Sequence, residues 1–421
     1  MRALVVGNGA REDALSWRLA ESPSCEAVFA APGNAGTASR GENWEVSATD
    51  GKTLVDRCIA NGIDLAVLGP ETAIAAGVGD RLRDAGLAVF GPNRSGGRLE
   101  SSKIFAKRFM ERHGIPTARA AVVHSLEAAN KVLEQWSGPV VVKADGLAAG
   151  KGVIVAPDVE AAHAVLGDWY RHGRVPGGGS DVVLEERLEG REVSVFALCD
   201  GRALVPIGAA CDYKRAGDGD TGPNTGGMGA YSPPDGFPDN LYDSVRERIL
   251  APLLRGLLAE GEEYVGVIYC GLMWTAQGPS VIEFNARFGD PETQTLLPRI
   301  NGDFALLLDS VARGAMDLSL ATLSHQHCVG VVLATGEYPR SSTPLRGLNP
   351  DVSLEEGCRA FWGASQRIDG TVSTGGGRVL TVTALGGGLQ EARSRAYDAV
   401  ARLAGRLGTN GLTYRTDIAA V

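Results

Sequence analysis

Residues 281–292 read Val-Ile-Glu-Phe-Asn-Ala-Arg-Phe-Gly-Asp-Pro-Glu, and this stretch decides the fold more than any other. Its apolar start indicates a buried strand, whose side chains alternate between two faces. Glu283, Asn285 and Arg287 therefore share one face. A carboxylate and an amide oxygen suit Mg²⁺, which takes few protein ligands and completes its shell with phosphates and water. The arginine suits an anionic group beside the metal. The simpler alternative is a strand edge with a surface ion pair.

A short strand ending in a lysine lies upstream, at residues 140–143, and a glycine-rich loop follows it at 144–153. Small residues let the backbone approach phosphate oxygens, and successive N–H groups form an anion-binding nest. The spacing does not fit a Walker A loop, because residue 152 is Gly rather than Ser or Thr. A flexible hairpin with solvated lysines is the alternative. The residues predicted to contact phosphates here are Lys143, Gly146, Gly150, Lys151 and Gly152.

Two further segments fit a nucleotide-dependent enzyme. Residues 185–194 follow a strand at 181–184, and their backbone and carboxylates could bind adenine and ribose, although a charged turn of this kind is common. Residues 212–229 contain six glycines among eighteen residues, which predicts no packed element. Long loops inside compact domains are usually functional or disordered, and the Asp-Tyr-Lys-Arg start favours an ordered ligand loop.

The order of these motifs resembles the ATP-grasp fold: Lys143, a glycine-rich loop, Glu-Glu-x-Leu-x-Gly-x-Glu and then Glu-Phe-Asn-x-Arg. The 212–229 loop resembles one family within that fold, the phosphoribosylamine–glycine ligases, also called glycinamide ribonucleotide synthetases. Residues 5–15, 31–37, 375–380 and 414–418 look like the same family, so the resemblance covers essentially all 421 residues.

The resemblance implies ATP-dependent ligation of glycine to 5-phosphoribosylamine through glycyl phosphate, the second step of purine biosynthesis, with Mg²⁺ or Mn²⁺. It implies four groups of site residues. The catalytic group is Arg287, Asp212, Lys214 and Asp290, and the metal ligands are Glu283 and Asn285. The nucleotide group adds Lys103, Glu186, Leu188 and Glu192 to the phosphate-contacting residues above. The substrate group is Gly9, Ala10, Arg11, Gly33, Asn34, Pro291 and Glu292.

The chain is expected to be an α/β protein of three parts. Residues 1–100 alternate strand and helix, which predicts right-handed βαβ units and an open parallel sheet. Their Gly7-x-Gly9 turn lacks the third glycine of a dinucleotide fingerprint, since residue 12 is Glu. A small-residue turn before a helix still binds phosphate, so a sugar phosphate is expected there. Residues 101–325 form the ATP-grasp unit with a mobile lid at about 117–190, and residues 326–421 form a small C-terminal α/β domain. Residue patterning predicts helices over 100–113 and 242–259 and strands at 328–334 and 377–385.

Three places depart from the family pattern. The family commonly has His where Asp13 and Tyr213 stand, and His-Ala-Gly-Thr at residues 362–365, which here read Trp-Gly-Ala-Ser. Asp13 lies nearest a ligand turn, and an anion there would repel a phosphate. We expect Asp13 to sit in the first helical turn and to orient Arg11 by an ion pair.

Composition limits the other possibilities. A net charge of −9 and a pI near 5.3 argue against a nucleic-acid partner. Seven scattered cysteines without a C-x-x-C pair favour neither disulfides nor zinc, and they fit the cytoplasm. Small-molecule substrates, no membrane partner and a monomer or weak oligomer are expected. Another ATP-grasp carboxylate–amine ligase and, more distantly, a dinucleotide-dependent oxidoreductase remain alternatives.

Overall fold

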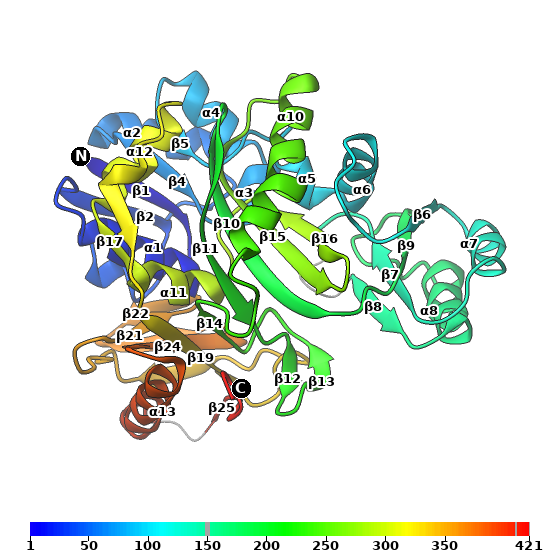
Figure 1. Ribbon diagram of the computed structural model, residues 1–421. Helices are drawn as coiled ribbons and strands as arrows, with labels where there is room; N and C mark the ends of the chain where they lie inside the picture. Colours follow the sequence, from blue (N-terminus) through cyan, green and yellow to red (C-terminus); the bar gives the residue numbers. More distant parts are fainter. Residues whose placement is uncertain (148–151, 409–410, 421) are drawn as a thin grey trace.

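The computed structural model describes residues 1–147, 152–408 and 411–420. Its N-terminal part is a five-stranded parallel sheet covered by helices, at the upper left of Figure 1. Strand β4 is buried along its whole length, as expected for a parallel sheet covered on both faces. The strands, in the sheet order β3-β2-β1-β4-β5, are β3 Glu42–Asn43, β2 Ala27–Pro32, β1 Arg2–Gly7, β4 Leu65–Leu68 and β5 Ala88–Phe90. The helices are α1 Ala10–Ala20, α2 Gly51–Asn61, α3 Glu71–Ala75 and α4 Val78–Asp84, with the short η1 at Thr37–Ser39. The predicted open parallel sheet is confirmed.

The chain order of this sheet reverses at β1, which has β2 on one side and β4 on the other. Open parallel sheets bind ligands at the carboxyl ends of their strands beside such a reversal. The turn at Gly9 follows β1 and Gly33 follows β2, so both lie at that edge.

Two helices connect the first sheet to the next part of the chain. A single helix was predicted over 100–113, but α5 Arg98–Ser101 and α6 Lys103–Arg112 are separated at Ser102. Ser102 has an extended backbone, and its side chain accepts a hydrogen bond from Phe105 N, so it caps α6. The capping interaction explains the break.

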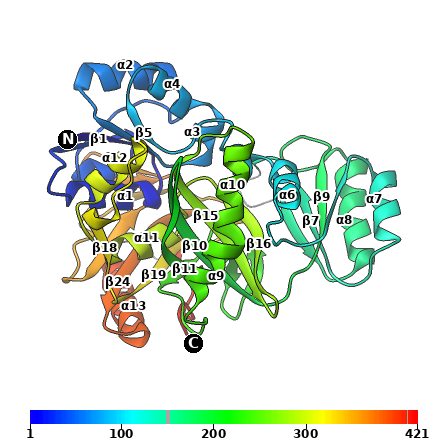
Figure 2. The same ribbon diagram turned by 45° about the horizontal axis from the view of Figure 1, so that its top comes forward.

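The predicted lid is an antiparallel sheet with its own hydrophobic core. Figures 1 and 2 both show it standing apart from the rest, with its two helices on the far side. Its sheet order is β6-β9-β7-β8, and its elements are β6 Ala120–Val123, α7 Leu126–Leu133, β7 Val140–Ala144, β8 Val153–Ala156, α8 Val159–Arg171 and β9 Val182–Glu186.

The largest sheet has nine strands and crosses the boundary predicted near residue 325. Strand β14 pairs with β19, from Gly229 opposite Val331 to Ser232 opposite Cys328. The C-terminal strands therefore extend the same sheet that carries Glu283 and Asn285. The sheet runs in the order β16 Gly278–Asn285, β15 Val265–Thr275, β10 Arg191–Asp200, β11 Leu204–Asp212, β14 Gly229–Ser232, β19 His327–Thr335, β24 Arg378–Gly386 and β21 Cys358–Trp362, and β25 Leu412–Thr413 pairs with β19.

The remaining elements surround this sheet. The helix predicted at 242–259 is a continuous run of α9 Leu241–Val245, the π-helical η2 Arg246–Leu250 and α10 Ala251–Ala259. The other helices are α11 Glu292–Leu296, η3 Leu297–Arg299, α12 Phe304–Ala312, η4 Leu318–Leu320 and α13 Leu389–Arg406. The small strands are β12 Arg215–Gly217, β13 Thr221–Asn224, β17 Ile300–Gly302, β18 Ala321–Leu323, β20 Leu345–Leu348, β22 Ser365–Ile368 and β23 Thr371–Thr374.

The 212–229 loop contains regular structure that its glycine content did not predict. The loop contains the two-stranded hairpin β12–β13, in which Arg215 pairs with Asn224 and Gly217 with Thr221. The glycines allow the tight turns of this hairpin, for example Gly219 at φ +66°. Within the described ranges, no helix has both the length and the apolar composition needed to cross a membrane.

Candidate active site

The polar residues at the end of β16 lie on one face, as their spacing predicted. Asn285 Nδ2 donates to Glu283 Oε1 over 3.4 Å, and Arg287 Nη2 donates to Asn285 Oδ1 over 3.2 Å. Burial opposes ionisation of Glu283, but the positive charges of Lys214 and Lys143 hold the pKa of its carboxyl below the usual value. Glu283 therefore stays an anion that two lysines from different parts of the chain share.

Glu283 and Asn285 fit a hard divalent cation. A carboxylate and an amide oxygen form an oxygen donor set too small to enclose an ion, which suits Mg²⁺ or Mn²⁺ bound jointly with phosphates. The described residues contain no group of three or more His, Cys, Asp or Glu side chains able to hold a metal. A metal at β16 would therefore take the rest of its ligands from substrate and water.

Lys143 is held by a buried carboxylate, Glu185, whose pairing with this lysine the sequence motifs did not predict. Its Nζ lies 2.8 Å from Glu185 Oε2 and donates to the carbonyl of Ile282 in β16 over 3.0 Å. Glu185 Oε1 pairs with Lys107 Nζ at 3.0 Å. All three charged groups are buried, so the carboxylate fixes Lys143 beside the strand that carries Glu283.

The start of the glycine-rich loop is tied to helix α6. Asp145 Oδ1 accepts from Ile104 N over 3.1 Å, and Lys103 Nζ donates to Gly146 O over 2.9 Å. Gly146 has φ +90°, which favours glycine. Gly152 O accepts from Ala144 N over 2.8 Å and closes the base of the loop. The predicted contacts Gly150 and Lys151 lie outside the described residues.

The three residues predicted for adenine and ribose lie at or just after the end of β9, the last strand of the lid. Glu186 is exposed and pairs with Arg119 at 3.1 Å, while Leu188 is half-buried. Glu192 is the second residue of β10, and its Oε2 lies 2.9 Å from Lys214 Nζ. Glu192 therefore lies between the nucleotide group and the catalytic group of predicted residues.

Asp212 and Lys214 form the other side of the site. Lys214 Nζ lies 3.0 Å from Asp212 Oδ1 as well as next to Glu192. Burial raises the pKa of Asp212, and Lys214 partly counteracts this. Burial disfavours the charged Lys214, but Asp212 and Glu192 hold its pKa well above the usual value. The lysine is therefore a permanent cation beside β16.

Glu292 is a buried carboxyl with an unusual pKa. Tyr269 OH donates to its Oε1 over 2.7 Å, and Ser194 Oγ donates to that tyrosine oxygen over 2.8 Å. Burial and the negative charge of Asp212 raise the pKa of Glu292 to about 7. Glu292 therefore changes charge near neutral pH, at the start of α11 and close to Asp212.

Asp290 is held by an arginine from the C-terminal strands. Arg378 Nη1 lies 3.2 Å from Asp290 Oδ1 and donates to the carbonyls of Asp290 and Gly226, each over 2.8 Å. Gln294 Nε2 also donates to Asp290 Oδ1 over 2.8 Å. Burial opposes ionisation, but Arg378 and Arg11 hold the pKa of Asp290 below its usual value. Pro291 follows Asp290 through a cis peptide bond and is buried.

Arg287 is positioned by two acids that sequence reasoning did not identify. Its Nη2 lies 2.8 Å from Glu100 Oε1, and its Nε lies 3.3 Å from Glu71 Oε2. Glu100 Oε2 also accepts from Ala286 N over 2.8 Å. Glu71 follows β4 and Glu100 belongs to α5, so the N-terminal part of the chain sets the orientation of this arginine.

The N-terminal turn lies next to the 285–292 segment. Arg11 Nη1 donates to Phe288 O over 3.1 Å, and a Cβ on Gly9 would lie 3.4 Å from Asp290 Oδ2. Ala10 is the first, buried residue of α1. Glu12 fills the turn, since its carboxylate accepts from Gly9 N and pairs with Arg11 Nε, both at 2.5 Å. That carboxylate stands where a dinucleotide fingerprint has glycine, which argues against the oxidoreductase alternative.

Gly33 and Asn34 shape the neighbouring turn. Gly33 has φ +71°. Asn34 Nδ2 donates to the carbonyls of Asn8 and Gly9, each over 3.0 Å, and to Trp362 O over 2.8 Å. Its Oδ1 accepts from Gly36 N and Thr37 N. The Asn34 side chain thus holds three backbone segments together at the carboxyl edge of the first sheet.

The expected ion pair between Asp13 and Arg11 was wrong. Asp13 lies in the first turn of α1, as expected, but its Oδ2 accepts from Trp362 N over 2.8 Å and its Oδ1 lies 3.8 Å from Arg40 Nε. Two of the departures from the family pattern therefore contact each other. Burial raises the pKa of Asp13 to about 6, despite Arg40 and the Trp362 hydrogen bond.

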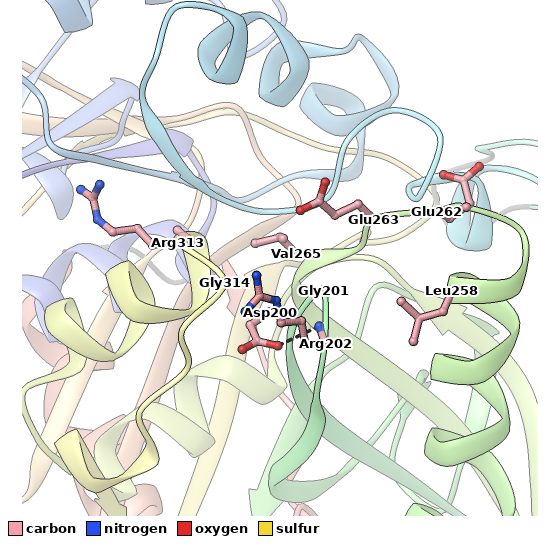
Figure 3. Close-up of a pocket in the computed structure, with 11 residues that line it drawn as sticks. Asp200, Gly201, Arg202, Leu258, Glu262, Glu263, Val265, Arg313 and Gly314 are labelled. Carbon is pink, nitrogen blue, oxygen red and sulfur yellow. Dashed lines mark hydrogen bonds between the residues drawn. The ribbon is translucent and has the colours of Figure 1, made fainter.

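A cavity of about 470 Å³ lies at a different place, and Figure 3 shows side chains that line it. Asp200, Arg202, Leu258, Glu262, Glu263 and Arg313 line it, with none of the predicted site residues. The Asp200 carboxylate already accepts from the backbone N–H groups of Arg202, Ala203 and Met316. The cavity offers no uncompensated polar group from that residue.

The fold and the polar residues around β16 together define an ATP-grasp enzyme. Models of one family match almost the whole chain: the phosphoribosylglycinamide synthetase N domain over residues 1–100, its ATP-grasp (A) domain over 101–293 and its C domain over 328–421. The chain therefore belongs to the phosphoribosylglycinamide synthetase family, and it is a ligase.

Individual relatives agree with this assignment. The phosphoribosylamine–glycine ligase of Neisseria meningitidis serogroup A is 43% identical over 423 residues, covering 100% of this chain and 99% of that protein. That of Caulobacter vibrioides is 44% identical over 418 residues, covering 99% and 97%. The crystal structure of the Thermotoga maritima phosphoribosylamine–glycine ligase matches with a TM-score of 0.86 at 33% identity, covering 99% of this chain and 100% of that one. A Hydrogenobacter thermophilus biotin carboxylase domain, 14% identical with a TM-score of 0.71, shares the fold.

Proposed function

We propose that the residues around β16 are where this chain joins glycine to 5-phosphoribosylamine, with conversion of ATP to ADP and phosphate. One observation carries the proposal: Glu283 is held ionised by Lys143 from the lid and by Lys214 from the 212–229 loop. A single carboxylate thus connects the nucleotide side of the site to the substrate side. We call Glu192, Asp212, Lys214, Glu283, Asn285, Arg287, Asp290 and Glu292 the polar cluster.

Phosphoryl transfer requires mainly positioning and neutralisation of charge. Lys103, Lys143, Lys151 and the backbone of Gly146, Gly150 and Gly152 offset the charge of the ATP phosphates, and Glu186, Leu188 and Glu192 bind the nucleoside. Glu283 and Asn285 hold Mg²⁺ or Mn²⁺, which supplies further neutralisation of the phosphates when bound. The binding of Lys143 to β16 supports this arrangement, because it brings cation and metal ligands to one place.

The chemistry has two steps. A glycine carboxylate oxygen attacks the γ-phosphorus of ATP, ADP leaves, and glycyl phosphate forms. The amine of 5-phosphoribosylamine then attacks the glycyl carbonyl, phosphate leaves, and the amine loses a proton. Arg287 orients the acyl phosphate, for which its fixed guanidinium between Glu71 and Glu100 is suited.

Substrate binding is assigned to the two edges of the polar cluster. Asp212, Lys214 and Asp290 bind the amine and carboxylate groups, with Pro291 and Glu292 beside them. Gly9, Ala10, Arg11, Gly33 and Asn34 form the sugar-phosphate side at the carboxyl edge of the first sheet. The contact of Arg11 with Phe288 O supports this division, because it joins the sugar-phosphate turn to the polar cluster.

The remaining proposals concern organisation. We propose three parts, 1–100, 101–325 with a lid at about 117–190, and 326–421. A monomer or weak oligomer is proposed. A cytoplasmic location is proposed and is supported by seven free cysteines.

A coupled ADP-release assay with freshly made 5-phosphoribosylamine tests the activity. Each substrate is omitted in turn, and we expect full turnover only with ATP, glycine and 5-phosphoribosylamine together. Full turnover with another amino acid or another amine would instead identify a different carboxylate–amine ligase of the same fold.

A further inference from the structure

Residues 415–419 bind the hairpin β12–β13 through hydrogen bonds and ion pairs. Arg415 Nη1 donates to Asp220 Oδ1 over 2.8 Å and to the carbonyl of Arg215 over 3.1 Å. Its Nε and Nη2 donate to the two oxygens of Asp417 over 2.7 and 2.6 Å. The Arg415 side chain is only 1% exposed, so its guanidinium is buried among these partners.

Each of the two segments also donates hydrogen bonds to carboxylates of the other. Asp218 in the hairpin accepts from Thr416 N over 2.8 Å and from the Thr416 hydroxyl, while Asp417 accepts from Gly219 N over 2.8 Å. Tyr213 OH accepts from Ala419 N over 2.9 Å, and the Arg415 guanidinium lies 4.8 Å from the centre of the Tyr213 ring. Residues 415–419 thus contact the 212–229 loop from Tyr213 to Asp220.

The hairpin makes little contribution to the core. Strand β13 is exposed at all four residues, and the Asp220 side chain is 69% exposed. None of the described residues 214–224 belongs to a hydrophobic cluster. Arg415 is buried, yet it donates hydrogen bonds to an exposed hairpin. It therefore orders that hairpin more than it stabilises the core.

The hairpin begins at a residue of the polar cluster. Lys214 lies between Tyr213 and Arg215, both contacted by the C-terminal residues. The carbonyl of Lys214 accepts from Thr225 N over 2.7 Å and from Thr225 Oγ1 over 2.8 Å. The Lys214 ammonium group reaches Asp212 and Glu192 from this fixed backbone.

We propose that residues 415–419 are a C-terminal clamp whose Arg415 is a positioning residue: it fixes the backbone at Lys214 and thereby sets the affinity of the enzyme for glycine. The proposal rests on the proposed function, in which Lys214 binds the amino-acid side of the reaction. Arg415 touches no substrate in this account and acts through the hairpin.

The test compares four variants of the full-length chain. Arg415→Met removes the guanidinium, and Arg415→Lys keeps a positive charge without the planar guanidinium. Asp220→Asn removes the negative charge of one exposed partner. Asp220 has φ +53°, a conformation that asparagine also tolerates. Arg406→Met is the matched control, because Arg406 is an exposed arginine of α13 whose Nη1 donates to Ser353 O over 2.9 Å.

We expect Arg415→Met to raise the KM for glycine at least tenfold and to leave the KM for ATP within twofold of wild type. Asp220→Asn should raise the KM for glycine severalfold, Arg415→Lys should lie between Arg415→Met and wild type, and Arg406→Met should change neither constant. Hydrogen exchange should rise at Gly219 and Thr225 in Arg415→Met and in Asp220→Asn.

Several outcomes overturn the clamp. An unchanged KM for glycine in Asp220→Asn does so even if Arg415→Met fails to fold, because Asp220 is exposed. Equal increases in the KM values for ATP and glycine would assign Arg415 a general stabilising role instead. If the wild-type enzyme turns over ATP without needing glycine, the proposed function is wrong and the KM for glycine no longer tests the clamp. Hydrogen exchange tests it independently, because unchanged exchange at Gly219 in the variants would reject the clamp.

Discussion

Glu283 is the residue at which the two sides of the polar cluster meet. Its carboxyl is buried, which alone would raise its pKa, yet the charges of Lys214 and Lys143 keep the pKa below the usual value. An anion stabilised in this way needs both cations in place. Removing it leaves two lysines without their shared counter-charge and takes a ligand from the proposed metal site.

Glu283→Gln is therefore expected to lower kcat by roughly a hundredfold or more, in line with the loss of one preorganised charge contact. The fold should persist, since glutamine has nearly the same volume. Steady-state kinetics over a range of Mg²⁺ concentrations measures the effect, and Glu247→Gln on the exposed η2 segment is the control. Near wild-type turnover at saturating Mg²⁺ would show that the β16 face is only structural.

The alternation of Glu283, Asn285 and Arg287 was predictable because it depends on local strand geometry alone. Their partners were not. Glu71 and Glu100 reach Arg287 across about 190 to 220 residues of chain, a separation that no local spacing rule spans. Glu185 belongs to the charged turn predicted at residues 185–194, but its burial between Lys107 and Lys143 follows only from the packing of the lid against β16.

Asp13 gives a pH-dependent prediction. Its pKa is raised from 3.8 to about 6 in the folded chain, mainly by burial. The folded state then holds the proton more tightly than the unfolded state, so stability is full below pH 4 and falls as the pH rises through 6. A shift of this size corresponds to up to about 3 kcal/mol.

Asp13→Asn keeps an acceptor for Trp362 N but cannot ionise. The variant should gain stability relative to wild type between pH 4 and pH 6.5, and the gain should then level off. Urea midpoints measured across this range test the prediction, with Asp56→Asn at an exposed position of α2 as the control. A constant difference between Asp13→Asn and wild type would mean that Asp13 has an ordinary pKa.

At the scale of elements, the break between α5 and α6 has a functional consequence. Residues 100–113 have the apolar spacing of one helix, so the sequence pattern did not separate them. The Ser102 side chain caps the N-terminus of α6 by accepting from Phe105 N, and Asp145 accepts from Ile104 N in the first turn. Asp145 thereby connects the start of the glycine-rich loop to α6, where Lys103 donates to Gly146 O.

Asp145→Ala is expected to remove this connection. Loss of a helix-capping acceptor costs about 1 kcal/mol of stability, and the loop start loses its tether, so the KM for ATP should rise severalfold. Asp158→Ala is the matched control, because Asp158 caps α8 through Ala161 N over 2.8 Å on the lid. Both variants should lose similar stability, and only Asp145→Ala should bind ATP less well. An equal change in the KM for ATP in both would mean that the tether has no specific role.

At the scale of the whole molecule, the nine-stranded sheet joins parts that the sequence divides. Patterning predicted the strands at 328–334 and 377–385, which correspond to β19 and β24. It did not predict that β19 pairs with β14, because strand pairing between distant segments is set by the tertiary fold. Arg378 in β24 reaches Asp290, and Arg415, which follows β25, reaches the 212–229 loop.

A fragment ending at residue 325 should therefore not fold into a stable enzyme. Its β14 would have β11 on one side and a newly exposed edge on the other, although all four of its residues are buried in the intact chain. An unprotected apolar edge is a template for aggregation. We expect the 1–325 fragment to aggregate or to unfold without cooperativity, as judged by size-exclusion chromatography and thermal melting. Residues 326–421 supplied as a second chain should restore part of its solubility, because they return β19 to that edge. A monodisperse 1–325 fragment with the ATP affinity of the full-length protein would show that residues 1–325 fold without the C-terminal strands.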